Sequence, residues 1–550
     1  MPFPVRTDVL KLANSWISVQ KVSMFTTQCF REWVSTLSWV HMIAIVYPWM
    51  EYVRKRILRG AVLVSCLGSS LEVCKAQDQP FRQAQGRPNV LFIAIDDMND
   101  WVGSFEGHPQ IITPHIDKLA EQGVLFSNAH CQAPICNPSR VSVFLGKLPS
   151  TTGMYFLGPN FRLVEGTKHE ETLFQYFRKH GYFSSTMGKV FHGAADKASF
   201  DHIEKSRGLR RPENKLRYTV PGSHPSWDWG QVDIPDEETR DYKTAEWAVE
   251  VLHELAKKEQ SFFLSIGFHL PHVPIYASKK WFDLYPLGGV QLPASRPDDR
   301  DDIPEIAKLL SLNHTAPRHE YMLESDEARH VVRAYLAANS FVDYLVGMVL
   351  QGLEESGEAD NTIIVLWSDH GFHMGEKLRW SKRSIWEEST RVPLIISAPG
   401  MKEGERCSRP VGLIDLFPTL ADLCGLEIRD DLEGQSLRPL LEDPKARWSK
   451  PALCTFGPNN HSLRSERWRY TKYADGSEEL YNHSSDPNEW TNLAGDLKYK
   501  RIINRFQKFL PKVNAEPLLG SAGSDSPLYG EGHIPLQEAM QRGREQLNAN

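Results

Sequence analysis

The chain has 550 residues, and 41% of them are hydrophobic, so it can bury a full core and form two or three structural units. Its formal net charge is −6 and no basic stripe marks a nucleic-acid surface, so attraction for an anionic substrate must come from local cations. Eight cysteines in so long a chain exclude a disulfide scaffold, although a single bridge stays open among Cys131, Cys407, Cys424 and Cys454.

Residues 1–86 are interpreted as an export leader, in part an overlong gene start. From Met50, the basic segment Arg54-Lys55-Arg56 precedes a short apolar segment that ends at Cys66, which is typical of a signal peptide. The end of that apolar segment also resembles a bacterial lipobox, in which case Cys66 would carry a lipid anchor. The alternative is a membrane helix over 33–52, but its basic flank would leave the protein in the cytoplasm. We expect export to the periplasm or the extracellular space.

Two apolar runs further along the chain end in acidic residues. The run 88–95 is rich in β-branched residues and ends in Asp96-Asp97, a pair that alone could equally cap a helix or form a turn. A second run, 361–367, is followed closely by Asp369-His370. Because α/β folds gather ligands at the carboxyl ends of parallel strands, we expect the three carboxylates and the imidazole to form one cluster. Such a set suits Ca²⁺ better than Mg²⁺, which requires stricter octahedral geometry, and gives Zn²⁺ little to prefer.

The segment Cys136-Asn137-Pro138-Ser139-Arg140 has two interpretations. On its own, Cys136 could be a small buried hydrophobic residue and Arg140 a surface cation. If Pro138 opens a helix, however, Arg140 lies one turn after Cys136 and its guanidinium lies beside that residue. Ser139 and the amides of the same turn would then form an anion-binding helix N-terminus.

Basic residues recur later in the sequence. Lys189 and His192 are spaced i, i+3, so on a helical turn they would share one face and point together into a cleft. A solvated basic turn is the alternative. The apolar strand 262–268 leads directly to His269 and His272. Of these two, His269 is interpreted as a structural histidine, with an outer partner that orients the site residues as the alternative.

Strands and helices alternate through 87–445, which predicts a doubly wound α/β domain with a mainly parallel sheet flanked by helices. Amphipathic helices are expected at 239–258 and 326–355, a further strand at 392–396, and a helix that starts at Asp415.

The pattern then changes to short strands. The segments 468–473 and 479–481 flank the turn sequence Ala474-Asp475-Gly476, which is a hairpin signal. We therefore predict a small C-terminal α+β subdomain with a short antiparallel sheet over 446–515. The remainder, 516–550, is dominated by Gly, Ser, Pro, Gln and Asn, and we expect a flexible tail.

Five motifs stand in order between about residues 87 and 500: Ile95-Asp96-Asp97, Cys136-Asn137-Pro138-Ser139-Arg140, Gly188-Lys189-Val190-Phe191-His192, His269-Leu270-Pro271-His272, and Ser368-Asp369-His370-Gly371 continuing to Gly375-Glu376. In this order they resemble the motifs of type I sulfatases of the alkaline phosphatase superfamily, and most of all those of the iduronate-2-sulfatase branch. The resemblance implies an alkaline phosphatase-like fold and hydrolysis of a sulfate ester.

In that family the cysteine that Cys136 matches is oxidised by a formylglycine-generating enzyme to Cα-formylglycine, whose hydrate supplies a gem-diol nucleophile. The resemblance also implies a bound Ca²⁺ that holds the nucleophilic hydroxyl and a sulfate oxygen. By position, the ligands of Ca²⁺ would be Asp96, Asp97, Asp369, His370 and the modified Cys136.

The remaining catalytic roles are implied in the same way. Lys189 and Lys382 would bind sulfate, and Lys382 follows a segment, 377–380, in which iduronate sulfatases typically have a different loop. His192 would remove a proton from the sulfated diol and expel sulfate. His272 would contact sulfate or protonate the leaving oxygen. With Arg140 these residues complete the expected catalytic and substrate-binding set.

The leading hypothesis is a Ca²⁺-dependent sulfatase that removes sulfate from a carbohydrate, such as the 2-O-sulfate of a uronic acid in a sulfated polysaccharide. Two alternatives stay open: a phosphodiester or phosphonate monoester hydrolase of the same superfamily, and a non-catalytic glycan-binding relative. Specificity is expected to lie in the segments 153–166, 193–235 and 276–325, whose Trp, Arg, Pro and His residues could stack on sugar rings.

Overall fold

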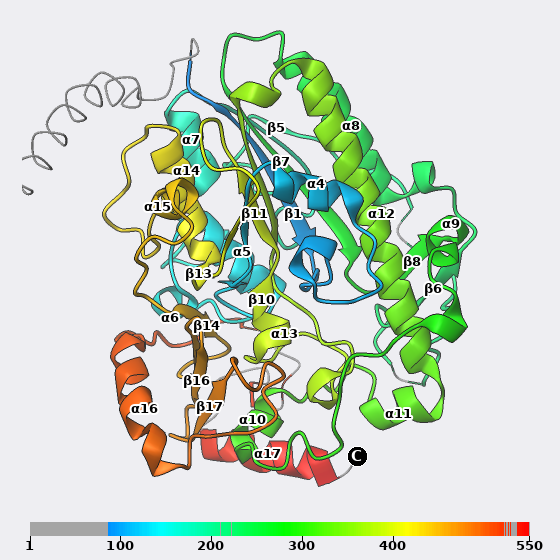
Figure 1. Ribbon diagram of the computed structural model, residues 1–550, viewed down its shortest axis with the longest axis vertical. Coiled ribbons are helices and arrows are strands. Elements are labelled where there is room, and N and C mark those ends of the chain that lie inside the picture. Colours follow the sequence, from blue (N-terminus) through cyan, green and yellow to red (C-terminus); the bar gives the residue numbers. More distant parts are fainter. Residues whose placement is uncertain are drawn as a thin grey trace, which may run out of the picture. The chain divides into compact units, whose positions relative to one another are not determined.

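The computed structural model describes residues 86–209, 211–221, 223–521, 523, 526, 528–529 and 536–548. Its main sheet has eight strands in the order β12-β2-β11-β9-β1-β7-β4-β5 (Figure 1). The strands of this sheet are β1 (Asn89–Asp96), β2 (Val124–Phe126), β4 (Phe183–Gly188), β5 (His202–Ile203), β7 (Phe262–Pro271), β9 (Thr362–Ser368), β11 (Leu394–Ser397) and β12 (Glu405–Cys407).

Strand β1 lies at the centre of the sheet and pairs in parallel with both β7 and β9. All eight of its residues are buried, because helices cover both faces of the sheet. Its side chains alternate between two cores: Val90, Phe92 and Ala94 face one, while Leu91, Ile93 and Ile95 face the other. The strand β11 is antiparallel to β9, which makes the sheet mixed but mainly parallel, as predicted.

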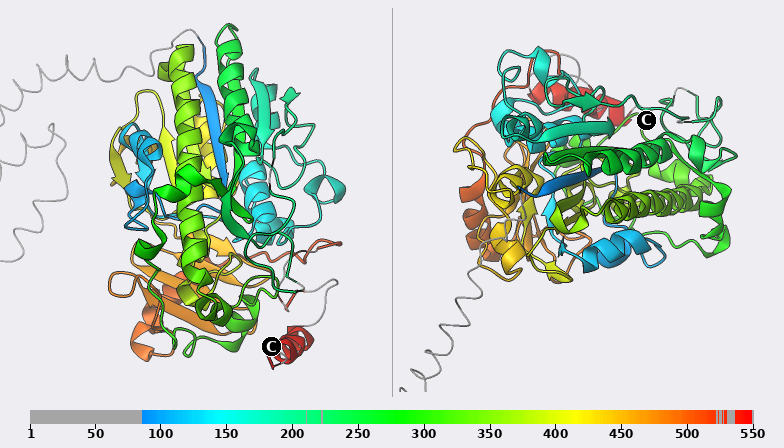
Figure 2. Two further views of the ribbon diagram at one scale, coloured as in Figure 1. Left: turned by 90° about the vertical axis from the view of Figure 1, so that its right-hand side faces the viewer. Right: turned by 90° about the horizontal axis from the view of Figure 1, so that it is seen from above.

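The helices fall on the two faces of the sheet and around its ends. On one face α8 and α12 run side by side with α4, and on the other lie α5, α7 and α14 (Figures 1 and 2). The helices are α4 (Pro114–Glu121), α5 (Cys136–Leu145), α6 (Pro149–Thr152), α7 (Leu173–Lys179), α8 (Arg240–Leu255), α9 (Lys279–Asp283), α10 (Glu305–Leu310), α11 (His319–Glu324), α12 (Glu327–Ser356), α13 (Glu387–Thr390), α14 (Leu416–Leu423), α15 (Arg438–Glu442), α16 (Lys500–Phe506) and α17 (Leu536–Asn548).

The two long helices match the predicted spans because their ends carry local signals. The Thr239 side chain caps α8 by accepting from the Tyr242 amide, and Gly357, with φ 79°, ends α12 in the left-handed conformation. Helix α12 is long and apolar enough to cross a membrane, but most of it is buried against α8, α4 and β7, as expected of a core helix.

Three smaller sheets complete the described structure. A three-stranded sheet has the order β10-β3-β13, a parallel pair joins β6 and β8, and the C-terminal antiparallel sheet has the order β14-β15-β16-β17. Their strands are β3 (Ala129–His130), β6 (Trp229–Val232), β8 (Ile275–Ser278), β10 (Arg391–Val392), β13 (Val411–Gly412), β14 (Ala452–Thr455), β15 (His461–Arg464), β16 (Trp468–Lys472) and β17 (Glu478–Asn482).

The predicted C-terminal hairpin is confirmed, since β16 and β17 pair antiparallel across the turn at 474–476. The predicted strand 392–396 is instead two strands in different sheets, β10 and β11, because Pro393 lacks an amide donor and interrupts the ladder. The leader expected over 1–86 and the anchor residue Cys66 lie outside the described residues, apart from Gly86.

The segment 516–550, for which a flexible tail is expected, is described only in part. Helix α17 packs Leu536 and Met540 against the larger hydrophobic core, and Arg544 forms an ion pair of 2.6 Å with Glu305. The ring of Tyr529 lies 5.1 Å from that of Phe156. These contacts involve residues distant in the sequence, so the local composition gave no sign of them.

Candidate active site

The acidic residues meet where β1 and β9 end. Ile95 pairs with Ser368, so Asp96 and Asp369 leave neighbouring strands at the same level. Asp97 follows in a left-handed conformation with φ 64°, and Asp369 Oδ1 accepts from its main-chain amide at 3.2 Å. All three carboxylates and the His370 imidazole are fully buried, as the cluster predicted from the two strand ends requires.

Cys136 is the first residue of α5, and cations surround its sulfur. The Sγ atom lies 3.2 Å from Lys382 Nζ, 3.9 Å from Lys189 Nζ and 3.3 Å from His370 Nε2. Burial alone would raise the pKa of the thiol, but these three residues and a hydrogen bond from His192 hold that pKa well below its ordinary value. The position at the start of α5 is therefore suited to a negatively charged nucleophile.

Arg140 lies one turn after Cys136 on α5, as predicted, but its guanidinium is directed elsewhere. Its Nε donates to Asp369 Oδ2 at 2.8 Å, one terminal nitrogen donates to the carbonyls of Lys189 and Val190, and the other lies 3.4 Å from Asp96 Oδ1. The prediction placed this group beside the nucleophile, whereas its hydrogen bonds hold the carboxylates, because α5 starts next to the two strand ends.

Ser139 also differs from its expected role. Its hydroxyl is fully buried and donates to the Asp369 carbonyl, so it ties α5 to the end of β9 and is not free to bind an anion.

Lys189 and His192 lie on a loop after β4, and the predicted helical turn is wrong. Gly188 has φ 82°, and a Cβ there would lie 2.1 Å from the Gly267 carbonyl, which accepts from the Lys189 amide at 2.8 Å. This close approach directs the chain into the site without a helix. Lys189 Nζ forms an ion pair with Asp96, and His192 is half-buried next to Cys136.

The two histidines after β7 have different surroundings. The Val273 carbonyl accepts from Nδ1 of His272 at 2.5 Å, and His272 Nε2 lies 4.0 Å from Asp97 Oδ2, at the edge of the acidic cluster. His269 instead lies between Asp241, at 3.3 Å from its Nδ1, and Arg240, at 3.3 Å from its Nε2. His272 therefore belongs to the site, while His269 is structural, as interpreted from the sequence.

Lys382 reaches the site from the loop before α13. Its Nζ donates to Asp97 Oδ1 at 2.6 Å in addition to its contact with Cys136. The next residue, Arg383, was not expected there; it is 6% exposed, has φ 73°, and its amide donates to the Pro134 carbonyl. Burial lowers the pKa of Arg383 to about 10, partly opposed by Cys136 and Asp97. The one feature of the sequence that could have indicated Arg383 as a site residue is its position directly after Lys382.

The donor set fits a hard divalent cation. Two overlapping groups of residues each bring their donor atoms within 4.8 Å of one another. One group is Asp96, Cys136, Asp369 and His370, and the other is Asp96, Asp97, Cys136 and His272. Asp97 Oδ2 is buried without a hydrogen-bond partner, and burial raises the pKa of Asp369 to about 7 although Arg140 and His370 oppose the rise. A cation bound here would satisfy that oxygen and neutralise the crowded carboxylates. The Gly371 carbonyl accepts from His370 Nδ1 at 3.1 Å, which leaves Nε2 directed into the cluster.

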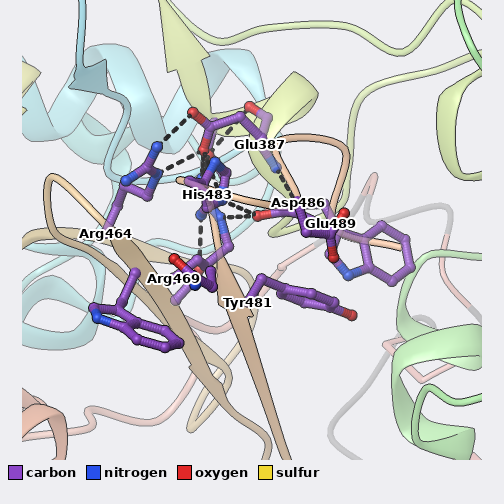
Figure 3. Close-up of polar contacts among 12 residues, drawn as sticks. Glu387, Arg464, Arg469, Tyr481, His483, Asp486 and Glu489 are labelled. Carbon is purple, nitrogen blue, oxygen red and sulfur yellow. Dashed lines mark hydrogen bonds and ion pairs between the residues drawn. The ribbon is translucent and has the colours of Figure 1, made fainter. Parts of the chain in front are cut away.

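A second buried charged cluster lies beside α13 and joins it to the C-terminal sheet (Figure 3). Glu387 Oε2 forms ion pairs with Arg469 and with Arg464, at 3.0 Å to the latter, and Glu489 pairs with Arg469 at 2.5 Å and with His483 at 2.9 Å. Two carboxylates and a histidine here could suggest a metal site, but the two guanidiniums already neutralise the carboxylates. This cluster could not be predicted from local sequence patterns, because its members are far apart along the chain.

The fold is that of the alkaline phosphatase superfamily, as comparison with solved structures shows. A 2-O GAG sulfatase (BT1596) aligns with a TM-score of 0.61 and 25% identity over 82% of this chain and 99% of its own. The phosphonate monoester hydrolase of Agrobacterium radiobacter aligns with a TM-score of 0.63 at 22% identity over 77% of this chain and 94% of its own, which shows the shared fold alone.

The sequence comparisons narrow the class. The family profile described as Sulfatase matches residues 88–426, and the chain belongs to this family. A second profile, "N-sulphoglucosamine sulphohydrolase, C-terminal", matches residues 375–516. A protein named sulfatase from Formosa agariphila is 38% identical over 82% of this chain and 91% of its own length. Iduronate 2-sulfatase of Homo sapiens is 29% identical over 80% of this chain and 96% of its own.

Proposed function

We propose that the protein is an exported sulfatase that removes sulfate esters from a carbohydrate, with the 2-O-sulfate of a uronic acid as the preferred group. The observation that carries this proposal is the single buried site in which Cys136 meets three carboxylates and the ammonium groups of Lys189 and Lys382. Family membership, the likeness to iduronate 2-sulfatase and the likeness to a 2-O GAG sulfatase support the choice of substrate class.

The proposal includes Ca²⁺ held by Asp96, Asp97, Asp369, His370 and residue 136, and oxidation of Cys136 to Cα-formylglycine by a separate maturation enzyme. Together the cation and the aldehyde hydrate would supply a charge-neutralised hydroxyl nucleophile at the start of α5. Oxygen ligands dominate the donor set, which favours this cation over zinc.

The side chains of the chain itself have separable roles. The ammonium groups of Lys189 and Lys382 lie 3.9 Å and 3.2 Å from the sulfur of Cys136, where they can bind a sulfate group and stabilise the charge that develops as its ester bond breaks. His192, next to residue 136, is placed to accept a proton, and His272 is placed at the rim to donate one to the leaving oxygen. Arg140 holds two of the carboxylates in place.

Mass spectrometry of the tryptic peptide that contains Cys136, combined with turnover of an aryl sulfate before and after chelation, tests this proposal. We expect an aldehyde at position 136 and activity that is lost with chelator and restored by Ca²⁺. Full activity with an unmodified thiol would contradict it. Faster turnover of a phosphate diester than of the sulfate by the same preparation would favour the phosphonate monoester hydrolase alternative, whose fold the chain shares. Glycan binding without turnover, unchanged by Cys136→Ala, would favour a non-catalytic relative.

A further inference from the structure

A large groove lies on the C-terminal part of the chain, between α16, the start of β16 and the segment 447–451 (Figure 1 labels α16 and β16). Its volume is about 1010 Å³, which is the size of a site for several sugar units or a comparable ligand. None of the residues placed in the active site lines it.

The charge of this groove is opposite to that of the chain. Although the formal net charge of the protein is −6, the groove is lined by six exposed cations and a single carboxylate, Glu466. Glu466 is already paired with Arg409 at 2.5 Å. Within the described residues, none of the six cations forms an ion pair with a carboxylate: Arg447, Lys450, Arg467, Arg501, Arg505 and Lys508.

Unneutralised cations gathered in one concave surface create a positive potential that attracts a polyanion. Such a surface costs the folded protein electrostatic free energy through mutual repulsion, so the cations are better accounted for by a ligand than by stability. Guanidiniums, four of the six, match the geometry of sulfate and carboxylate groups through paired donors.

Aromatic rings line the same groove as these cations. Trp468 is half-buried and lies beneath the Arg467 guanidinium, whose central carbon is 5.0 Å from the ring centroid. Trp448 is fixed by a hydrogen bond of 2.8 Å from its Nε1 to the Pro410 carbonyl, and Phe509 is 38% exposed. Rings held at the surface in this way offer apolar faces to the C–H faces of sugars, next to donors for their acidic substituents.

We propose that this groove, which we call the basic groove, binds a sulfated carbohydrate chain at a distance along the polymer from the ester being cleaved. It would hold a polymer on the enzyme between successive reactions without taking part in the chemistry. The choice of a sulfated glycan over other polyanions rests on the proposed function, whereas the existence of an anion-binding groove rests on its charges and rings alone.

The test measures binding of dextran sulfate, with unsulfated dextran as the matched ligand, to protein that carries Cys136→Ala so that no turnover occurs. We expect dextran sulfate to bind, its affinity to fall steeply as salt rises, and dextran not to bind. Adding Arg501→Glu and Arg505→Glu, both exposed on α16, should weaken binding at least about tenfold, because two attractive charges become repulsive.

The matched control carries Lys257→Glu and Lys402→Glu, two exposed lysines outside the groove, and should bind dextran sulfate like its parent. With Cys136 restored, both double variants should turn over a small aryl sulfate at the parental rate.

Equal weakening of dextran sulfate binding in the control, or unchanged binding after the α16 substitutions, would overturn the proposal. It would also fail if anionic lipid vesicles or single-stranded DNA bound the groove while dextran sulfate did not. If the protein with Cys136 had no sulfatase activity but dextran sulfate still bound through α16, the proposed activity would be wrong and the proposal of an anion-binding groove would stand.

Discussion

The guanidinium of Arg140 donates to two carboxylates and two main-chain carbonyls, and no part of the side chain is exposed. Its five donors are arranged in a plane, so they can reach groups from β1, β9 and the loop after β4 at the same time. An ammonium has three donors on a single atom and cannot span these acceptors. Charge alone therefore does not account for the residue at this position.

We expect Arg140→Lys to lower the free energy of unfolding by about 2 to 4 kcal/mol, since buried acceptors and a carboxylate would lose their partners. Urea denaturation at neutral pH measures this loss. Arg296→Lys provides the matched control, because Arg296 pairs with Asp298 on the surface and its replacement should leave the free energy of unfolding nearly unchanged. If the two variants proved equally stable, Arg140 would not hold the carboxylates as described.

At the scale of elements, the segment 377–391 connects the active site to the C-terminal sheet. Lys377 pairs with Asp299 at 2.7 Å and donates to the Glu489 carbonyl, and Glu489 Oε2 accepts from the Glu387 amide at 3.0 Å. The ion pairs of Glu387 with two arginines of the sheet add to this attachment (Figure 3). Three residues of the segment have positive φ, which a chain adopts only where its surroundings enforce it: Lys377, Leu378 and Arg383.

Because Lys382 lies within this segment, we infer that the attachment to the sheet helps to position its ammonium, with Glu489 as a positioning residue. We expect Glu489→Gln to weaken inhibition by inorganic sulfate by about tenfold, close to the effect of Lys382→Ala, which corresponds to about 1.4 kcal/mol. In the Lys382→Ala background, Glu489→Gln should have little further effect on sulfate affinity. The reason is that Glu489 would act only through the contact between the Lys382 ammonium and sulfate, which the first substitution has already removed.

The matched control for this cycle is Glu478→Gln on β17 of the same sheet. Glu478 accepts from the Tyr470 hydroxyl at 2.7 Å, and the other partners of its side chain, Lys472 and Gln507, also lie outside the segment, so the variant should leave the inhibition constant of sulfate unchanged. Additive effects of Glu489→Gln and Lys382→Ala on sulfate affinity would show a general loss of stability and not a positioning role. If Lys382→Ala alone left sulfate affinity unchanged, the role proposed for that lysine would be wrong.

These elements also show what the sequence could predict. The ends of β1 and β9 and the hairpin of β16 and β17 follow from short local patterns, and the structure confirms them. The helix expected to open at Pro138 begins two residues earlier, at Cys136. The loop of Lys189 could not be predicted, because it depends on the approach of Gly188 to Gly267, which is 79 residues away. The attachment of Lys377 to Glu489 likewise joins residues 112 positions apart. The hydrophobic periodicity of a sequence depends on residues that are close along the chain. It therefore cannot reveal contacts between residues 79 or 112 positions apart.

At the scale of the whole molecule, buried histidines couple stability to pH. His461 on β15 lies between the Thr455 hydroxyl, at 2.9 Å from its Nδ1, and Asn514 Oδ1, at 2.8 Å from its Nε2. It therefore joins the C-terminal sheet to the chain that follows α16. Burial lowers its pKa from 6.5 to about 4, with the hydrogen bond to Asn514 opposing the shift. The folded protein thus holds this ring neutral at a pH at which the unfolded chain protonates it.

Because the unfolded state binds more protons at His461 than the folded state does between about pH 4 and 6.5, the stability that His461 contributes must fall as the pH falls through this range. From pH 7 to pH 5 we expect His461 to account for a loss of about 2 kcal/mol in the free energy of unfolding. Urea denaturation at both pH values, compared between the parent and His461→Gln, isolates this contribution, since glutamine does not titrate. The variant should lose about 2 kcal/mol less than the parent over the interval. His169→Gln, at an exposed histidine, should retain the parental dependence. An unchanged difference between pH 7 and pH 5 in His461→Gln would mean that acid unfolding is driven by other buried groups.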